Sequence, residues 1–85
     1  MTIFTYTITD PLGIHARPAG LLVKAAGNFR STITLAKEGK TGDAKKIFNV
    51  MGMGVKKDDT VTITIEGEDE AEAETALKAF FEANL

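Results

Sequence analysis

Residues 60–66 alternate strictly between threonine and β-branched apolar residues before a closing glutamate. The apolar members, Val61, Ile63 and Ile65, fall on one side of an extended chain, and the threonines fall on the other. A period of two predicts a β-strand with one buried side and one side in water. Antiparallel sheets commonly divide in this way, whereas parallel sheets bury both faces. The segment therefore favours an antiparallel sheet that is covered on one face only.

The same period predicts three further strands, over residues 4–8, 32–37 and 40–42. Asp10-Pro11 ends the first of them, and Glu38-Gly39 supplies a tight turn between the other two. With residues 60–66, these segments make a sheet of four strands.

Helical periodicity predicts three helices, over residues 16–26, 44–51 and 69–84. Their predicted inner faces are Ala19, Leu22, Val23 and Ala26, then Ile47, Val50 and Met51, then Ala73, Leu77 and Phe80. The order of elements is βαββαβα. It predicts an α+β fold, an open-faced two-layer sandwich in which three helices cover one face of a four-stranded antiparallel sheet. We expect residues 1–85 to form a single domain.

Composition narrows the setting and the partners of the chain. Cysteine is absent and no apolar run reaches membrane-spanning length, so we expect a cytoplasmic protein without disulfides and without membrane insertion. Residues 11–57 carry nine lysine or arginine residues against two acids, whereas residues 58–85 carry nine acids against one lysine. A basic half of this kind favours an acidic protein partner. A sequence pI near 5.3 and few aromatic residues argue against nucleic acid.

The only histidine, His15, immediately precedes the first predicted helix. Pro18 predicts a helix start one or two residues earlier, because the missing N–H of proline would have no partner in a first turn. His15 then lies at or beside the N-cap. The free N–H groups of a first turn attract anions, so we expect Ala16, Arg17 and Pro18 to cradle an anion attached to His15.

His15 and Arg17 together suggest phosphoryl transfer. The positive field of the helix start disfavours a charged imidazole, which leaves a ring nitrogen free to attack phosphorus. The Arg17 guanidinium can donate two parallel hydrogen bonds to phosphoryl oxygens. No general base or nucleotide-binding loop accompanies the pair. Such a chain would depend on partner proteins both to load and to unload the phosphoryl group.

One plainer interpretation stays open at this point, because a lone histidine before a helix can be a structural cap. Gly52-Met53-Gly54 does not form a nucleotide loop, since it lacks the third glycine and the Gly-Lys-Ser/Thr ending. One imidazole without further histidines or cysteines does not form a metal site, and we predict no metal and no cofactor.

The segment Ile14-His15-Ala16-Arg17-Pro18 resembles the active-centre motif of the HPr family, the histidine-containing phosphocarriers of the bacterial phosphoenolpyruvate:sugar phosphotransferase system. Other segments resemble family segments in the same order and spacing, over essentially the whole chain. These are Gly39-Lys40-Thr41, Lys45, Met51-Gly52-Met53-Gly54 and Glu66-Gly67-Glu68-Asp69-Glu70.

The resemblance implies a function and its partners. Enzyme I would phosphorylate His15 at Nδ1, Arg17 would stabilise the phosphoryl group, and sugar-specific EIIA proteins would take it for sugar uptake. The chain would then be a stoichiometric carrier rather than an enzyme, and we expect a monomer. A regulatory protein of the same fold, or a relay protein of the nitrogen branch, stays open as an alternative.

The resemblance also implies a docking surface. Helix geometry places Gly20, Leu21 and Lys24 on a different face from the predicted core residues. The family docks its partners through matching positions on the first two helices. The predicted docking surface comprises Gly20, Leu21, Lys24, Lys45, Lys46, Ile47, Phe48 and Met51. Ile47 and Met51 can equally belong to the core.

Lys46 departs from the family pattern. In Gram-positive relatives, the matching residue is a serine that a kinase phosphorylates, and lysine cannot accept that modification. We therefore do not predict the serine switch. Lys46 either adds positive charge for docking or is a neutral surface residue.

Overall fold

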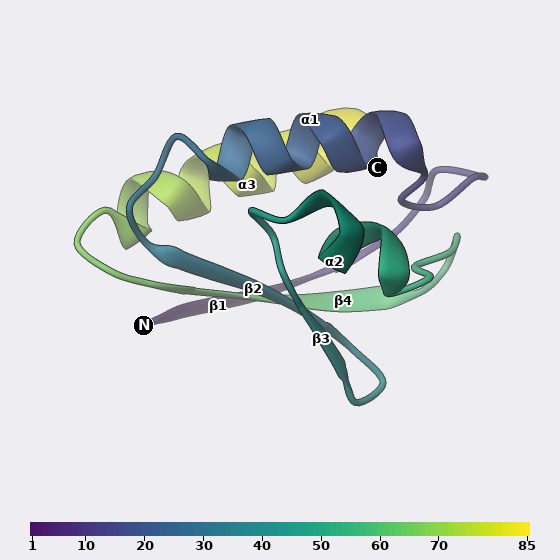
Figure 1. Cartoon of the computed structure of the whole chain (residues 1–85), viewed down its shortest axis with the longest axis horizontal. Helices are drawn as coiled ribbons and strands as arrows, with labels where there is room; N and C mark the ends of the chain where they lie inside the picture. The colour runs from purple at the N-terminus through teal and green to yellow at the C-terminus, as the bar shows by residue number, and fades with distance from the viewer.

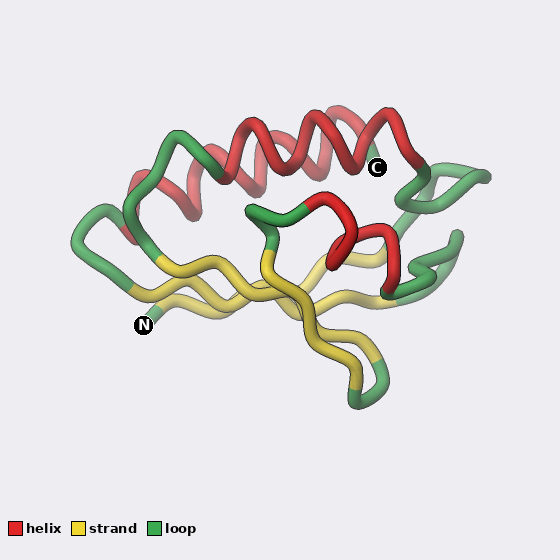
Figure 2. The backbone as a smooth tube through the Cα atoms, viewed as in Figure 1, coloured by secondary structure: helices red, strands yellow, loops and turns green.

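The computed structural model describes residues 1–85 and contains one four-stranded antiparallel sheet with helices on one face (Figure 1). The elements are β1 (Thr2–Thr7), α1 (Ala16–Ala26), β2 (Thr32–Lys37), β3 (Lys40–Asp43), α2 (Ile47–Gly52), β4 (Thr60–Glu66) and α3 (Glu70–Asn84). The strand order is β1-β4-β2-β3, so β4 lies inside the sheet. Figure 2 shows the helices and the strands as two layers. The predicted open-faced sandwich is confirmed.

β4 is the centre of the sheet and has the alternation expected of it. Ile63 lies opposite Phe4 on one side and opposite Leu35 on the other. The three apolar side chains of β4 are fully buried, while its threonines face outward. Across the strand pair, the hydroxyls of Thr7 and Thr60 are hydrogen-bonded at 3.0 Å. The face of the sheet away from the helices is therefore rich in threonine.

α1 follows its prediction, whereas the inner face of α3 differs from it. α1 begins at Ala16 and is capped by Gly27. In α3, the side chain at the centre of the core is Phe81, which is fully buried, and Phe80 is only partly buried. Phe81 makes edge-to-face contacts with Phe4 and Tyr6 of β1. These aromatic contacts across the layers select the residue one position beyond the predicted one.

No helix is both long enough and apolar enough to cross a membrane.

α2 begins at Ile47, three residues later than its periodicity predicted. The carboxylate of Asp43 accepts a hydrogen bond from the N–H of Lys45 at 2.9 Å, and the carbonyl of Asp43 accepts one from Lys46 at 3.0 Å. These bonds hold residues 44–46 in a turn, because an aspartate side chain competes with the helix for nearby backbone donors. Val50 is the buried residue of α2.

The other boundaries differ by one or two residues. β1 starts at Thr2 and ends before Ile8, which still exchanges backbone hydrogen bonds with Asp58 and Asp59. β3 extends to Asp43. α3 starts at Glu70 because the preceding residue, Asp69, is its N-cap.

Candidate functional site

His15 is the N-cap of α1, as its position before Pro18 predicted. Its backbone is extended, with φ −89° and ψ −175°, and its carbonyl accepts a hydrogen bond from the N–H of Ala19 at 2.9 Å. The imidazole makes no capping hydrogen bond to the helix. The side chain is half-buried. A structural histidine would use its ring nitrogens in hydrogen bonds within the fold, whereas neither ring nitrogen of His15 makes one.

The first turn of α1 leaves backbone donors unused next to this imidazole. The N–H groups of Ala16 and Arg17 donate to no protein acceptor, and Pro18 has no N–H. The turn contains no acidic residue. Unpaired N–H groups and the helix dipole together attract an anion at this place.

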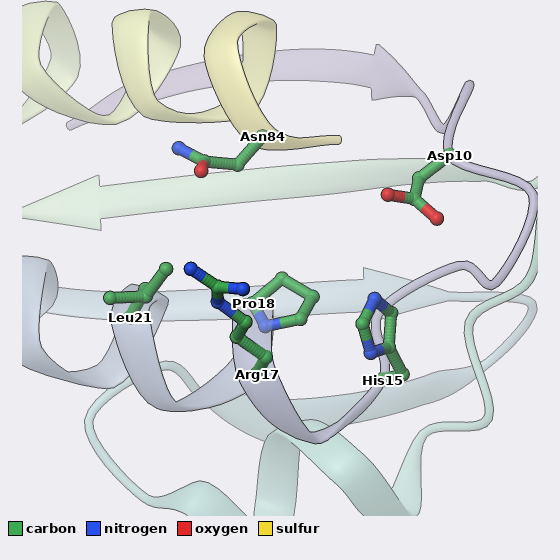
Figure 3. Close-up of a pocket in the computed structure, with 6 residues that line it drawn as sticks. All are labelled: Asp10, His15, Arg17, Pro18, Leu21 and Asn84. Atoms are coloured by element: carbon green, nitrogen blue, oxygen red, sulfur yellow. The ribbon is translucent and has the colours of Figure 1, made fainter.

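A pocket of about 270 Å³ opens beside His15 (Figure 3). Its lining residues are Asp10, His15, Arg17, Pro18, Leu21 and Asn84. Figure 3 shows His15, Arg17, Pro18 and Leu21 along the start of α1, with Asn84 and Asp10 facing them. The Arg17 side chain is exposed and makes no hydrogen bond or ion pair within the protein. Its guanidinium is therefore available to a bound anion.

Residues 10–14, just before His15, form a turn that is held by hydrogen bonds. Asp10 accepts hydrogen bonds from the N–H of Leu12 at its carboxylate, at 2.8 Å, and from the N–H of Gly13 at its carbonyl, at 2.9 Å. Ile14 then donates to the carbonyl of Val55 at 3.1 Å. Gly13 has φ +65°, and a Cβ there would collide with that same carbonyl. Only glycine fits this place, so the turn fixes the approach to His15.

The apolar members of the predicted docking surface lie on neighbouring parts of α1 and α2. Leu21 is 43% exposed, Met51 42% and Phe48 84%. Ile47 is half-buried, and its Cδ1 lies 4.0 Å from the position of a Cβ on Gly20. α2 therefore lies against α1 at Gly20, and the three exposed apolar side chains belong to these two adjoining helices.

The lysines of this surface are not equivalent. Lys24 and Lys46 are exposed, and Lys46 is the N-cap of α2. Lys45 is half-buried, and its ammonium donates a hydrogen bond of 2.7 Å to the carbonyl of Phe29, just beyond α1. One donor of the Lys45 ammonium is therefore engaged within the fold, while its positive charge is not paired with an acid. The basic groups that remain free near the exposed apolar residues are Arg17, Lys24 and Lys46.

A family model described as the PTS HPr component phosphorylation site matches residues 3–83. The chain belongs to the HPr family. Among curated proteins, the phosphocarrier protein HPr of Mycoplasma genitalium is 45% identical over 85 residues, which are 99% of this chain and 97% of that protein. The recognition of the family from its motifs is confirmed.

Solved HPr structures have the same fold. The histidine-containing phosphocarrier protein of a Mycoplasma superposes with a TM-score of 0.91 at 42% identity, over 93% of this chain and 90% of that one. HPr from Thermoanaerobacter tengcongensis superposes with a TM-score of 0.93 at 40% identity, over 98% and 93%.

The HPr motif led to most of the pocket, but two of its lining residues were missed. The sequence marks Asp10 only as the end of a strand and Asn84 only as the end of a helix. They meet because the carbonyl of Leu85 accepts hydrogen bonds from the N–H groups of Thr9 and Asp10, at 2.6 and 2.9 Å. No local pattern marks such a contact, since it joins the two ends of the sequence.

Proposed function

We propose that this chain carries a phosphoryl group on Nδ1 of His15, accepts it from phosphorylated Enzyme I, and passes it to EIIA proteins for sugar uptake. The observation that carries the proposal is the free imidazole of His15 at the open start of α1, in one pocket with the free guanidinium of Arg17. The proposal places the protein in the cytoplasm as a monomer that acts between partner enzymes.

The chemistry follows from these groups. The lone pair of Nδ1 attacks the phosphorus of the donor, a nitrogen–phosphorus bond forms, and the bond from phosphorus to the donor breaks. The N–H groups of Ala16 and Arg17 and the Arg17 guanidinium face the charge that spreads over the phosphoryl oxygens. The chain needs no general base, because Nδ1 attacks with its own lone pair. Transfer to an acceptor is the same step in reverse.

Docking to both partners uses one surface in this proposal. Leu21, Phe48 and Met51 supply exposed apolar area, and the free cations near them favour an acidic partner. A small surface of this kind suits successive, short-lived complexes. Lys46 adds to its positive charge, and Lys45 contributes through the position it gives the chain before α2.

A regulatory role is the second candidate. The catabolite repression protein Crh of Bacillus subtilis, solved as a swapped dimer, is 35% identical and superposes with a TM-score of 0.78. The unpaired imidazole of His15 favours the carrier role over a purely regulatory one, because binding alone gives no reason to leave both ring nitrogens free. A nitrogen-branch relay would share this imidazole and differ only in its partners.

The test is a phosphorylation assay on the intact protein. We would mix it with Enzyme I, magnesium and phosphoenolpyruvate and follow its mass, with His15→Ala as the control. We expect the mass to rise by one phosphoryl group that is acid-labile and missing from the control. Adding an EIIA protein should then remove the group.

Two results would contradict the proposal. If the protein gains no phosphoryl group from an Enzyme I that is active on another HPr, the regulatory role is favoured. If it is loaded but no sugar-specific EIIA protein unloads it, the nitrogen-branch relay is favoured.

A further inference from the structure

The loop that connects α2 to β4, residues 54–59, contains no helix or strand, yet one side chain holds both of its ends. The ammonium of Lys37, at the end of β2, donates a hydrogen bond of 3.1 Å to the carbonyl of Gly54. The same ammonium forms an ion pair of 2.6 Å with the carboxylate of Asp59. Lys37 therefore fastens the first and the last residue of the 54–59 loop to the sheet.

The ion pair between Lys37 and Asp59 is partly sheltered from water. The two side chains are 13% and 25% exposed. The carboxylate oxygen that faces Lys37 also accepts a hydrogen bond from the N–H of Lys56 at 2.8 Å. The hydrogen bond from Lys37, and after it that from Lys56, lowers the pKa of Asp59, so this carboxylate is charged at neutral pH. Loss of either charge would leave its partner in a partly desolvated place without a counter-charge.

The 54–59 loop in turn holds the residue before His15. The carbonyl of Val55 accepts a hydrogen bond from the N–H of Ile14 at 3.1 Å, and both residues are buried. A Cβ on Gly13 would collide with the same carbonyl, so the two backbones are in direct contact. Figure 1 shows this loop and the connection from β1 to α1 at the same end of the molecule. A shift of the loop would therefore move the backbone from which the imidazole extends.

We infer that Lys37 and Asp59 are positioning residues for phosphoryl transfer at His15. Their ion pair fixes the 54–59 loop, and the loop fixes the imidazole relative to the first turn of α1. The inference rests on the proposed function. Neither side chain lines the pocket of His15, and neither belongs to the docking surface. Their effect should appear in the rate of transfer rather than in the affinity for a partner, because attack on phosphorus requires an accurately placed nucleophile.

The first experiment measures single-turnover transfer from phosphorylated Enzyme I over a range of carrier concentrations. We expect Lys37→Met and Asp59→Asn each to lower the maximal rate about 10-fold and to leave the half-saturating concentration unchanged. Asp59→Asn keeps the size of the side chain and an acceptor for the N–H of Lys56, so it tests the charge. The double variant should lose little more than either single one, because both remove the same contact.

The conservative variant Lys37→Arg should keep most of the rate. A guanidinium has enough donors to reach the carbonyl of Gly54 and the carboxylate of Asp59 together, and it keeps the positive charge. A rate as low as that of Lys37→Met would instead show that the pair does not act through these two contacts.

Two controls distinguish a positioning role from a general loss of stability. Lys57→Met removes an exposed ion pair with Asp58 from the same loop and should leave the rate unchanged. Asp69→Asn removes bonds that join the start of α3 to residues 30 and 31, at the far end of α1 from His15 (Figure 1). It should lower the urea midpoint without lowering the rate.

Amide hydrogen exchange measures the link between the loop and Ile14 without any phosphorylation. We expect Lys37→Met and Asp59→Asn to raise the exchange rate of the Ile14 N–H about 10-fold, because the loop that shields it opens locally. The N–H of Ala44, which donates to the carbonyl of Ile33 elsewhere in the sheet, is the internal reference and should change little.

Three results would overturn the inference. If the variants lose stability and keep the rate of transfer, the ion pair only stabilises the fold. If Asp69→Asn lowers the rate as much as Asp59→Asn does, the loss reflects stability rather than position. If exchange at Ile14 does not change, the ion pair does not hold the loop. A wild-type chain that Enzyme I does not phosphorylate would instead contradict the proposed function, and exchange at Ile14 would then report on the loop alone.

Discussion

The N-terminal ends of α1 and α3 are built in opposite ways, although both helices cover the same face of the sheet (Figure 1). The first turn of α1 has no acidic residue, and its N-cap, His15, makes no capping bond. The first turn of α3 contains Glu70 and Glu72, and Asp69 precedes it. The chain thus neutralises the positive end of α3 with its own carboxylates and leaves that of α1 open to an external anion.

Two of the carboxylates at the start of α3, those of Asp69 and Glu70, make bonds within the fold. Asp69 accepts hydrogen bonds from the Ser31 hydroxyl and from the N–H groups of Arg30 and Ser31. These bonds, that of the Ser31 hydroxyl first, lower the pKa of Asp69 to about 2. The N-terminal ammonium of Met1, 3.1 Å away, lowers the pKa of Glu70. The start of α3 therefore joins segments of the fold, whereas the N–H groups at the start of α1 have no partner in the protein.

Phosphoryl transfer at the start of α1 should depend most on Arg17. We expect Arg17→Ala to lower the rate of phosphoryl transfer by about 100-fold, as removal of one donor to a developing anion does elsewhere. The urea midpoint should not change, because the side chain is exposed and makes no bond within the protein. Single-turnover transfer from phosphorylated Enzyme I measures the rate. Lys24→Ala, which removes an exposed charge farther along α1, is the control and should affect KM alone.

Because of the bonds that Asp69 accepts at the start of α3, the protein should lose stability in acid. The folded pKa of Asp69, about 2, lies below its ordinary value of 3.8, so the folded state binds fewer protons. The contribution is fully present above the unfolded value and is lost as pH falls from 3.8 towards 2. We expect Asp69→Asn to lower the urea midpoint at neutral pH and to flatten its fall in acid. A variant with an unchanged acid profile would show that Asp69 does not link the two segments.

The two lysines before α2 differ in the same way, with a smaller expected effect: Lys45 is hydrogen-bonded within the fold, and Lys46 is exposed. Lys45→Met should lower the free energy of unfolding by about 1 kcal/mol, since the carbonyl of Phe29 loses its partner. Lys46→Met should leave it unchanged, because that side chain is exposed. Paired urea titrations measure both. Equal losses would mean that the bond from Lys45 adds nothing to stability.

The smallest expected effect comes from making the start of α1 resemble the start of α3. Ala16→Glu places a carboxylate in the first turn of α1 and should stabilise the protein by about 0.5 kcal/mol. The same charge should lower the extent of phosphorylation of His15, because it competes with the phosphoryl group for the free donors. Ala16→Gln is the neutral control. If the carboxylate leaves phosphorylation unchanged, the start of α1 does not hold the phosphoryl group.

Local patterns in the sequence determined the elements and the place of His15. The period of two along residues 60–66 predicted the central strand with its true ends, and Pro18 predicted the start of α1. These features depend on near neighbours in the chain, through side-chain alternation and the missing N–H of proline. They can be read without knowing what lies across the core.

Only the tertiary structure decided which residues meet across the layers. Phe81 rather than Phe80 fills the core, because its ring contacts those of Phe4 and Tyr6 in β1. Lys45 is used by the carbonyl of Phe29, and Asn84 reaches the pocket of His15 through the bonds that Leu85 accepts. Each of these contacts joins segments that are distant in sequence. Their geometry depends on how the sheet and the helices pack, which no local period records.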